Sequence, residues 1–265
     1  MELRDKVVIV TGGGNGIGAA MCRRFVAEGA TEVIVADLDG DAADTLAADI
    51  GATAVQLDVT NESATRELVA DVERRHGRVD LFCANAGIAA PQGLEMSNER
   101  WQRTWEVNVL SHVFATRAVL PGMLERGDGY FLATVSAAGL LTNIGAAAYS
   151  VTKHGALALA EWLSVTYGDQ GLKVSALCPQ FVETRMIDDF ATLEMDDSFI
   201  RSVAITADDT AEKVVEGLAA ERFLILPHPE VQQYFRNKAN DHDRWIGGMR
   251  KLQRAWMPKG APPPS

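Results

Sequence analysis

The chain has 265 residues, 47% hydrophobic and 23% charged, which is typical of a soluble globular protein and not of a disordered one. A formal net charge of −11 argues against a nucleic-acid partner, because the phosphate backbone would be repelled. The apolar run in the opening MELRDKVVIV is too short for a signal peptide or a membrane span, so we expect no membrane partner.

Cysteine and histidine usage predicts neither disulfides nor a metal site. The three cysteines, Cys22, Cys83 and Cys178, are odd in number and far apart, which favours reduced thiols and a cytoplasmic location. The five histidines show no metal-ligand spacing with one another or with cysteine. We therefore predict no bound metal.

Short β-branched runs alternate with helix-length segments along most of the chain. Several runs are apolar throughout, as expected for strands buried on both faces of a parallel sheet. Strands are predicted at residues 6–12, 32–37, 54–59, 79–87, 129–136, 172–179 and 223–226, and helices at 18–29, 61–76, 98–119, 149–168 and 208–220, the last starting at Asp208 or Asp209. Because such alternation produces right-handed crossovers, we predict an α/β fold with a doubly wound parallel seven-stranded sheet and helices on both faces.

The alternation is not interrupted by a linker or a repeat, so we predict one domain over residues 1–227. An insert at 186–207 lies between the sixth and seventh strands, and its apolar residues could cover a ligand. Residues 228–265 form a helical C-terminal tail whose last residues we expect to be disordered. In the tail, Trp245, Ile246, Met249 and Leu252 recur at helical spacing, and we expect this stripe to pack on the domain or on a partner subunit.

The first predicted strand runs directly into a glycine-rich turn, TGGGNGIGAAM. Glycines at positions 12, 16 and 18 allow a tight turn in which backbone amides at a helix N-terminus can approach a phosphate. Asp37 ends the second strand, where a carboxylate can accept hydrogen bonds from the ribose hydroxyls of adenosine and would repel a 2′-phosphate. Leu38 offers no arginine to reverse that preference. NAD is therefore favoured over NADP, although Asp37 could instead cap a helix.

Two tyrosine–lysine pairs have a spacing of four residues, Tyr149 with Lys153 and Tyr234 with Lys238. This spacing places both side chains on one helix face and also arises by chance. Ser136 precedes the first pair at a predicted strand end, where such folds place ligands, whereas the tail pair has no matching serine. Because an ammonium group favours a nearby phenolate, the first pair could exchange a proton with a substrate hydroxyl that Ser136 orients. We predict that the first pair is catalytic and that the tail pair is not.

Together these motifs resemble those of the short-chain dehydrogenase/reductase family, in its compact single-domain branch. The set is T-G-x-x-x-G-x-G at 11–18, Asp58–Val59, Asn85-Ala86-Gly87, Asn108, Ser136, and Tyr149 with Lys153. The resemblance covers about residues 5–227 and implies a Rossmann fold. It also implies that Asn108, Ser136, Tyr149 and Lys153 are catalytic, and that Asn108 holds a water linking Lys153 to solvent.

The resemblance further implies which residues bind the cofactor. They are Gly12, Asn15, Gly16, Ile17, Gly18, Asp37, Asp58, Val59, Asn85, Ala86, Gly87, Tyr149, Lys153, Pro179, Val182 and Thr184. Asp58 and Val59 would end the third strand beside adenine, and Val182 with Thr184 would bond the nicotinamide carboxamide. The sequence departs from the family pattern at Ala84, usually asparagine, and at Gln180, usually glycine. Gln180 brings a polar side chain near the substrate entrance.

The sequence therefore predicts an NAD-dependent dehydrogenase that acts on a small-molecule secondary alcohol or its ketone. The small and apolar neighbours of Ser136 fit a hydrophobic substrate and plain core packing about equally. An NADP-linked carbonyl reductase and a catalytically slow NAD-binding sensor are the alternatives. The helices at 98–119 and 149–168 resemble those of the family's dimer interface, so we expect a homo-oligomer, either a dimer or a tetramer.

Overall fold

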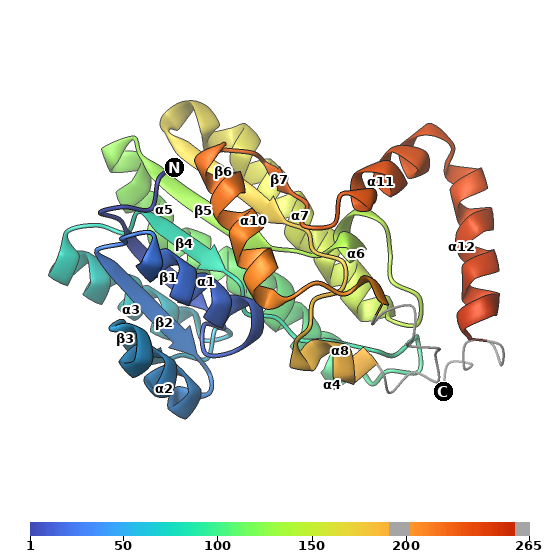
Figure 1. Cartoon of the computed structure of the whole chain (residues 1–265), viewed down its shortest axis with the longest axis horizontal. Helices are drawn as coiled ribbons and strands as arrows, with labels where there is room; N and C mark the ends of the chain where they lie inside the picture. Colours follow the sequence, from blue (N-terminus) through green and yellow to red (C-terminus); the bar gives the residue numbers. More distant parts are fainter. Residues whose placement is uncertain (191–201, 258–265) are drawn as a thin grey trace.

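Seven parallel strands form a single sheet in the order β3-β2-β1-β4-β5-β6-β7 (Figure 1). The computed structural model describes residues 1–190 and 202–257. The strands are β1 (Val7–Thr11), β2 (Glu32–Asp37), β3 (Thr53–Gln56), β4 (Leu81–Ala84), β5 (Gly129–Thr134), β6 (Leu172–Leu177) and β7 (Leu224–Ile225). The predicted doubly wound sheet is confirmed. Its strand order reverses between β1 and β4, the position where such sheets bind ligands.

Helices cover both faces of the sheet (Figure 1). One face carries α1 (Gly16–Ala27), α2 (Gly40–Ile50) and α10 (Ala207–Ala219), and the other carries α3 (Glu62–His76), α5 (Ser111–Arg126) and α7 (Ala147–Tyr167). Successive residues of a strand point to opposite faces of the sheet. Val8 of β1 therefore packs in the core under α1, α2 and α10, and Ile9 packs in the core under α3, α5 and α7. Two separate cores on one sheet explain why the central strands are apolar throughout.

The predicted helix at 98–119 is longer and is built in three parts. It consists of α4 (Asn98–Trp105), the π-helical turn η1 (Glu106–Leu110) and α5. Among the described residues, this run, Asn98–Arg126, is the one that length and composition alone would allow to cross a membrane. Half of its most apolar stretch is buried in the fold, as in the core helix of a soluble protein.

Two predicted element ends are wrong. Helix α10 begins at Ala207, and its cap is Thr206, not Asp208 or Asp209. The Thr206 hydroxyl accepts a hydrogen bond from the Asp209 amide at 3.0 Å, and the Thr206 amide donates to the Asp209 carboxylate at 3.3 Å, which forms a reciprocal capping box. Strand β3 stops at Gln56, so Asp58 and Val59 lie in the loop beyond it and do not end the strand.

The predicted insert starts with α8 (Arg185–Phe190) and is closed at its base by backbone pairing. Val182 and Ile205 form a parallel bridge, the Glu183 amide donates to the Ile205 carbonyl at 2.9 Å, and the Ile205 amide donates to the Phe181 carbonyl at 3.1 Å. Residues 191–201 of the insert lie outside the described residues. So do residues 258–265, for which disorder was expected.

The tail forms two helices, α11 (Glu230–Asn240) and α12 (His242–Trp256), as the sequence predicted. Val231 anchors α11 in the core, and the Lys238 ammonium donates to the carbonyls of Leu140 and Leu141 at 2.8 and 2.9 Å. Helix α12 stands away from the sheet (Figure 1), and none of its residues is buried within the described part of the chain. Its apolar stripe therefore remains partly exposed in one chain, with Ile246 44% accessible. Burial against a partner subunit remains a prediction.

Removal of residues 241–265 should change the mass of the assembly or lower its melting temperature, because an apolar stripe of this kind is a liability in water unless a partner covers it. Light scattering and thermal melts of the truncated protein measure both quantities. A control variant, Arg250→Gln with Lys251→Gln, alters the polar face and leaves the stripe intact. If the truncated protein keeps both the mass and the melting temperature, α12 is an appendage without a structural partner.

Candidate active site

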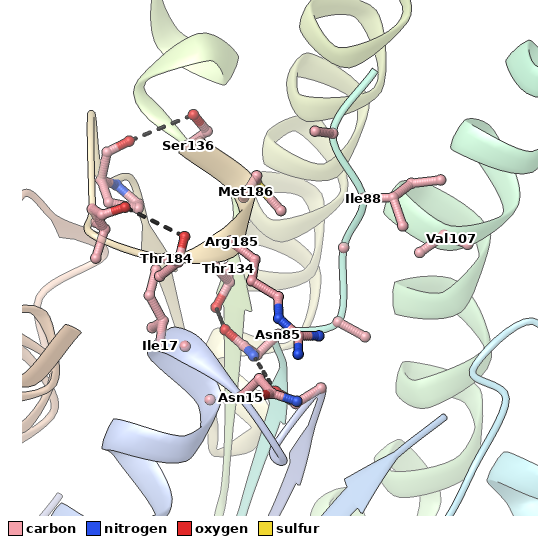
Figure 2. A pocket seen from close by; sticks show the side chains of 18 of the residues that line it. Asn15, Ile17, Asn85, Ile88, Val107, Thr134, Ser136, Thr184, Arg185 and Met186 are labelled. Atoms are coloured by element: carbon pink, nitrogen blue, oxygen red, sulfur yellow. Dashed lines mark hydrogen bonds between the residues drawn. The ribbon is translucent and has the colours of Figure 1, made fainter. Parts of the chain in front are cut away.

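A cavity of about 710 Å³ opens at the carboxyl ends of the strands. This volume is in the range of roughly 300–1,000 Å³ that is usual for small-molecule sites. The predicted cofactor residues all line it, from the glycine-rich turn at 12–18 to Thr184, and so do Ser136, Tyr149 and Lys153. Asn108 is the predicted catalytic residue that does not. Figure 2 shows the cavity with residues of the turn at one end and Ser136 at the other.

The conformation and close packing of the glycine-rich turn require residues that have no Cβ. Gly12 and Gly16 have φ angles of 62° and 53°, in the left-handed region that glycine adopts readily. A Cβ on Gly18 would lie 2.0 Å from the carbonyl oxygen of Gly12, so the first turn of α1 can pack on the loop only with glycine there. Asn15 precedes α1 without a side-chain cap, and the first turn of this helix carries no acidic residue. The N-terminus of α1 therefore presents uncapped N–H groups to an anion.

Asp37 lies at the end of β2 beside this turn. Its carboxylate accepts hydrogen bonds from the Gly14 amide at 2.8 Å and from the Asp39 amide at 3.0 Å. Asp39 caps α2 by accepting from the Ala42 amide, so the alternative interpretation of Asp37 as the helix cap is wrong. Each carboxylate oxygen retains a further lone pair, and the side chain lines the cavity. Asp37 can therefore accept hydrogen bonds from a ligand's hydroxyl groups.

Asp58 is held by its own loop and by an arginine of α4. It accepts hydrogen bonds from the Thr60 amide at 2.9 Å and hydroxyl at 2.7 Å, and the Arg103 guanidinium is 3.7 Å away. Desolvation alone would raise the pKa of Asp58, but the bonds from Thr60 and the charge of Arg103 outweigh it and lower the pKa. The carboxylate is thus kept ionised at the cavity wall.

Asn85 has a structural role at the point where three strands end. Its side-chain amide donates to the carbonyls of Thr11 and Gly12 at 3.0 and 3.2 Å, and its carbonyl oxygen accepts from the Thr134 hydroxyl at 3.0 Å. The Thr11 hydroxyl in turn accepts from the backbone amides of Asn85 and Ala86. These bonds join the ends of β1, β4 and β5 below the cavity.

Asn108 is fully buried in the π-helical turn. Its side chain accepts from the Ile88 amide at 2.9 Å and donates to the Ile88 carbonyl at 3.1 Å and the Thr152 hydroxyl at 3.2 Å. The amide group is therefore engaged in positioning the loop after β4. A relay water, as the family resemblance implies, would have to donate to the remaining lone pair of the side-chain oxygen or bind the main chain, whose hydrogen-bond pattern the π-turn alters.

Tyr149 and Lys153 project from α7 to the inner end of the cavity, where they are 6% and 2% exposed. The Lys153 ammonium donates to the Thr134 carbonyl at 3.1 Å and lies 5.6 Å from the centre of the Tyr149 ring. The Tyr149 hydroxyl lies 3.9 Å from the sulfur of Met186. Ser136 caps the short helix α6 (Ala137–Leu140), accepting from the Ala138 amide at 3.1 Å. The structure thus brings the serine, tyrosine and lysine to one place.

Burial is the largest influence on the pKa values of Tyr149 and Lys153. Desolvation raises the pKa of Tyr149, and a hydrogen bond with Ser136 offsets only part of the increase. Desolvation also lowers the pKa of Lys153 to about 8. In the chain without ligands, desolvation therefore outweighs the influence of the Lys153 ammonium, which favours the phenolate. A further positive charge beside Tyr149 is needed to ionise it near neutral pH.

The second tyrosine–lysine pair is not part of any such group. Tyr234 is 42% exposed on α11 and does not line the cavity. Lys238, besides its bonds to two carbonyls, lies 5.0 Å from the centre of the Trp245 ring and joins α11 to α12. The spacing of four residues is the same in both pairs, and only the first pair reaches the cavity.

Several residues line the cavity without having been predicted to bind a ligand. They include Ile88, Arg103 and Arg185, whereas Met186 belongs to the insert that was expected to cover a ligand and Gln180 was expected near the substrate entrance. Gln180 is a departure from the family pattern, and its backbone N–H donates a hydrogen bond to Nδ1 of His228 at 3.2 Å. Arg185 directly follows Thr184, and that adjacency was the signal in the sequence that could have identified it. The others come from helices or loops, and no motif marked them.

Comparison with known proteins identifies the family. Residues 6–194 match the family described as short chain dehydrogenase. The chain is 32% identical to 1-deoxy-11-beta-hydroxypentalenate dehydrogenase of Streptomyces exfoliatus, with 100% of this chain and 94% of the relative aligned. It is 34% identical to meso-2,3-butanediol dehydrogenase of Serratia marcescens, over 83% of this chain and 88% of that protein.

A solved structure agrees with this assignment. A short-chain dehydrogenase/reductase from Burkholderia phymatum, crystallised in complex with NAD, superposes with a TM-score of 0.83 at 27% identity, covering 92% of this chain and 96% of that one. The sequence motifs, the strand order and these relatives lead to one conclusion: the chain belongs to the short-chain dehydrogenase/reductase family.

Proposed function

We propose that the chain is an NAD-dependent dehydrogenase that oxidises a secondary alcohol or reduces the corresponding ketone, with Tyr149 as general acid and base. One observation carries the proposal. A buried serine–tyrosine–lysine group and an uncapped helix N-terminus beside Asp37 line the same cavity. The first arrangement suits proton transfer at an oxygen, and the second suits a dinucleotide.

The residues present fit NAD. Gly12, Gly16 and Gly18 leave the backbone open where a side chain would obstruct a phosphate, and Asp37 can hold the adenosine ribose. Asp58 and Val59 would contact adenine, while Lys153, Val182 and Thr184 would hold the nicotinamide end. The relative crystallised with NAD supports the same choice. When bound, this cofactor supplies the hydride acceptor or donor.

The chain's own residues supply the proton chemistry. Ser136 and Tyr149 hold the substrate oxygen between their hydroxyl groups, where Ser136 stabilises developing charge. Tyr149 in its phenolate form, which the positive charge of an oxidised nicotinamide would favour, accepts the proton of the substrate hydroxyl. In the reverse direction Tyr149 returns that proton to the ketone oxygen. Lys153 stabilises the phenolate through its ammonium charge.

A hydrophobic substrate fits the wall near Ser136. Ile88, Phe181 and Met186 line the cavity with apolar side chains, and Met186 lies beside the Tyr149 hydroxyl. Three relatives are named for alcohols or hydroxy compounds: hydroxypentalenate, butanediol and, in Lavandula x intermedia, borneol, the last at 30% identity over 80% of this chain. These names support an alcohol or ketone as the substrate class.

We also propose a cytoplasmic homo-oligomer. Val151, Trp162 and Val165 on α7 are 51%, 55% and 86% exposed, and Trp105 of α4 is 38% exposed, so the helices expected at a dimer interface present apolar side chains to solvent. The three cysteines are buried and unbonded, as in a reducing compartment.

Two other functions remain testable on the same fold. An NADP-linked carbonyl reductase is opposed by Asp37, which would repel a 2′-phosphate. An NAD-binding sensor would need no proton transfer, so the buried group around Tyr149 counts against it. Turnover of a panel of hydrophobic alcohols with NAD and with NADP, followed by absorbance of the reduced nicotinamide, separates all three.

Tyr149→Phe should reduce turnover at least ~100-fold, because the variant keeps the ring and loses the group that transfers the proton. The affinity for NADH, measured by fluorescence titration, should change little. Tyr234→Phe is the matched control and should keep near-normal turnover. The opposite ranking of the two variants would show that the catalytic pair has been misidentified.

Lys153→Met should move the pH dependence of alcohol oxidation. The rate should rise with pH as Tyr149 loses its proton, and the rise should occur at higher pH in the variant because the neighbouring positive charge, which lowers the pKa of the phenol, is gone. Rates across a pH series at saturating NAD measure the shift. Lys238→Met should leave the profile in place. An unshifted profile in Lys153→Met would exclude the proposed role of the ammonium.

Asp37→Ala should narrow the preference for NAD over NADP, since the variant neither bonds the ribose diol nor repels the 2′-phosphate. The measurement is kcat/KM with each cofactor. Asp39→Ala removes the cap of α2, which costs about 1 kcal/mol of stability, and should leave the preference unchanged. Equal or better use of NADP by the unmodified protein would refute the assignment to NAD.

A further inference from the structure

Arg185 is the first residue of α8, and its side chain reaches into the cavity (Figure 2). In Figure 2 its side chain extends toward the end of the cavity formed by the glycine-rich turn, where Asn85 and Asn15 are labelled, and away from Ser136. Within the described residues, the guanidinium takes part in no hydrogen bond or ion pair, and the side chain is exposed to the cavity's solvent. A planar group with five N–H donors is thus free to bind a ligand.

The other two cations of the cavity wall are already engaged. Arg103 donates to the Thr60 hydroxyl at 2.9 Å and lies near the Asp58 carboxylate. Lys153 donates to the Thr134 carbonyl and is buried. Among the lining residues that the structure describes, Arg185 is therefore the cation available to neutralise an anion.

The glycine-rich turn and the N-terminus of α1 also favour an anion near Arg185. A Cβ on Gly16 would lie 3.1 Å from the methyl carbon of Thr184, so the glycine-rich turn and the segment that carries Arg185 approach each other closely. The N-terminus of α1 starts at this glycine and has no side-chain cap. An anion between the two would receive backbone N–H groups and the helix dipole from one side and the guanidinium from the other.

We propose that Arg185 binds the pyrophosphate of the dinucleotide and thereby ties α8 to the cofactor. The proposal rests on the cofactor proposed above and is independent of the substrate. A substrate carboxylate offers the same anionic oxygens, but the guanidinium lies at the turn and not beside Ser136, which favours the pyrophosphate.

This contact would also fix the position of Met186 over Tyr149. Met186 follows Arg185 directly, and its sulfur lies 3.9 Å from the Tyr149 hydroxyl. Three residues before Arg185, Val182 is fixed by its bridge to Ile205. With Arg185 bound to a phosphate oxygen, the short segment between these points is held at both ends, and Met186 is fixed over the catalytic tyrosine.

The test measures binding, without turnover. Arg185→Gln should raise the Kd for NADH and for ADP-ribose about tenfold, which is the loss of affinity expected for one charge-assisted contact. The Kd for adenosine should not change, because adenosine has no phosphate. Arg185→Lys keeps the charge without the planar fork, so its Kd should fall between those of the wild type and Arg185→Gln. Arg66→Gln on α3 makes the same change of net charge at an exposed position and should bind like the wild type. Calorimetry gives the ADP-ribose values, nicotinamide fluorescence gives NADH, and competition with NADH gives adenosine.

Four results would overturn the inference, and they are distinguishable. If the wild type binds neither NADH nor ADP-ribose, the proposed cofactor is wrong as well. If the wild type binds both and Arg185→Gln binds them equally well, only the role of Arg185 fails. An equal loss for adenosine would indicate a distorted site. An unchanged Kd for ADP-ribose with a raised KM for a carboxylated alcohol would assign the guanidinium to the substrate.

Discussion

The hydrogen bonds around Asn85 hold together the ends of three strands on which the rest of the site is built. One side chain bonds the main chain of β1 and a side chain of β5 while its own backbone continues from β4. The glycine-rich turn follows Thr11, the loop that contacts Asn108 follows Asn85, and the Thr134 carbonyl holds the ammonium of Lys153. Because these groups are largely shielded from water, an unpaired member would cost about 1–3 kcal/mol. The cofactor and catalytic residues therefore share one rigid base.

Most of the fold could be predicted from the sequence because it depends on local patterns. Strands with neighbours on both sides and helices on both faces must be apolar throughout, and that signal is strong in β1, β4 and β5. The residue at which β3 ends could not be predicted from its own sequence, because it depends on the pairing of β3 with β2. Its last pair is Gln56 with Asp37, where β2 also ends, so Asp58 has no strand left to pair with. The π-turn at Asn108 leaves the apolar periodicity nearly unchanged and gave no sign in the sequence.

The candidate site was predictable where its residues directly follow strands or share one helix, as with Asp37, Ser136 and the pair on α7. Residues that reach the cavity from elsewhere were missed, since Arg103 comes from α4 and Arg185 from the start of α8. The net direction of the Tyr149 pKa shift in the unliganded chain could not be predicted from the sequence. The sequence shows that an ammonium is near, but desolvation depends on every group packed around the phenol, such as Met186. An electrostatic interaction with Cys178 also raises the pKa of Tyr149.

The bridge between Val182 and Ile205 has an evolutionary consequence. It closes the loop at its base, where the backbone of residues 181–183 pairs with that of Ile205. The entropy cost of closing a loop grows only with the logarithm of its length, so this segment can lengthen, shorten or change composition at little expense in stability. Residues fixed by β5 and α7 stay where they are. A change of substrate can thus be made by exchanging one segment while the reactive groups on β5 and α7 keep their positions.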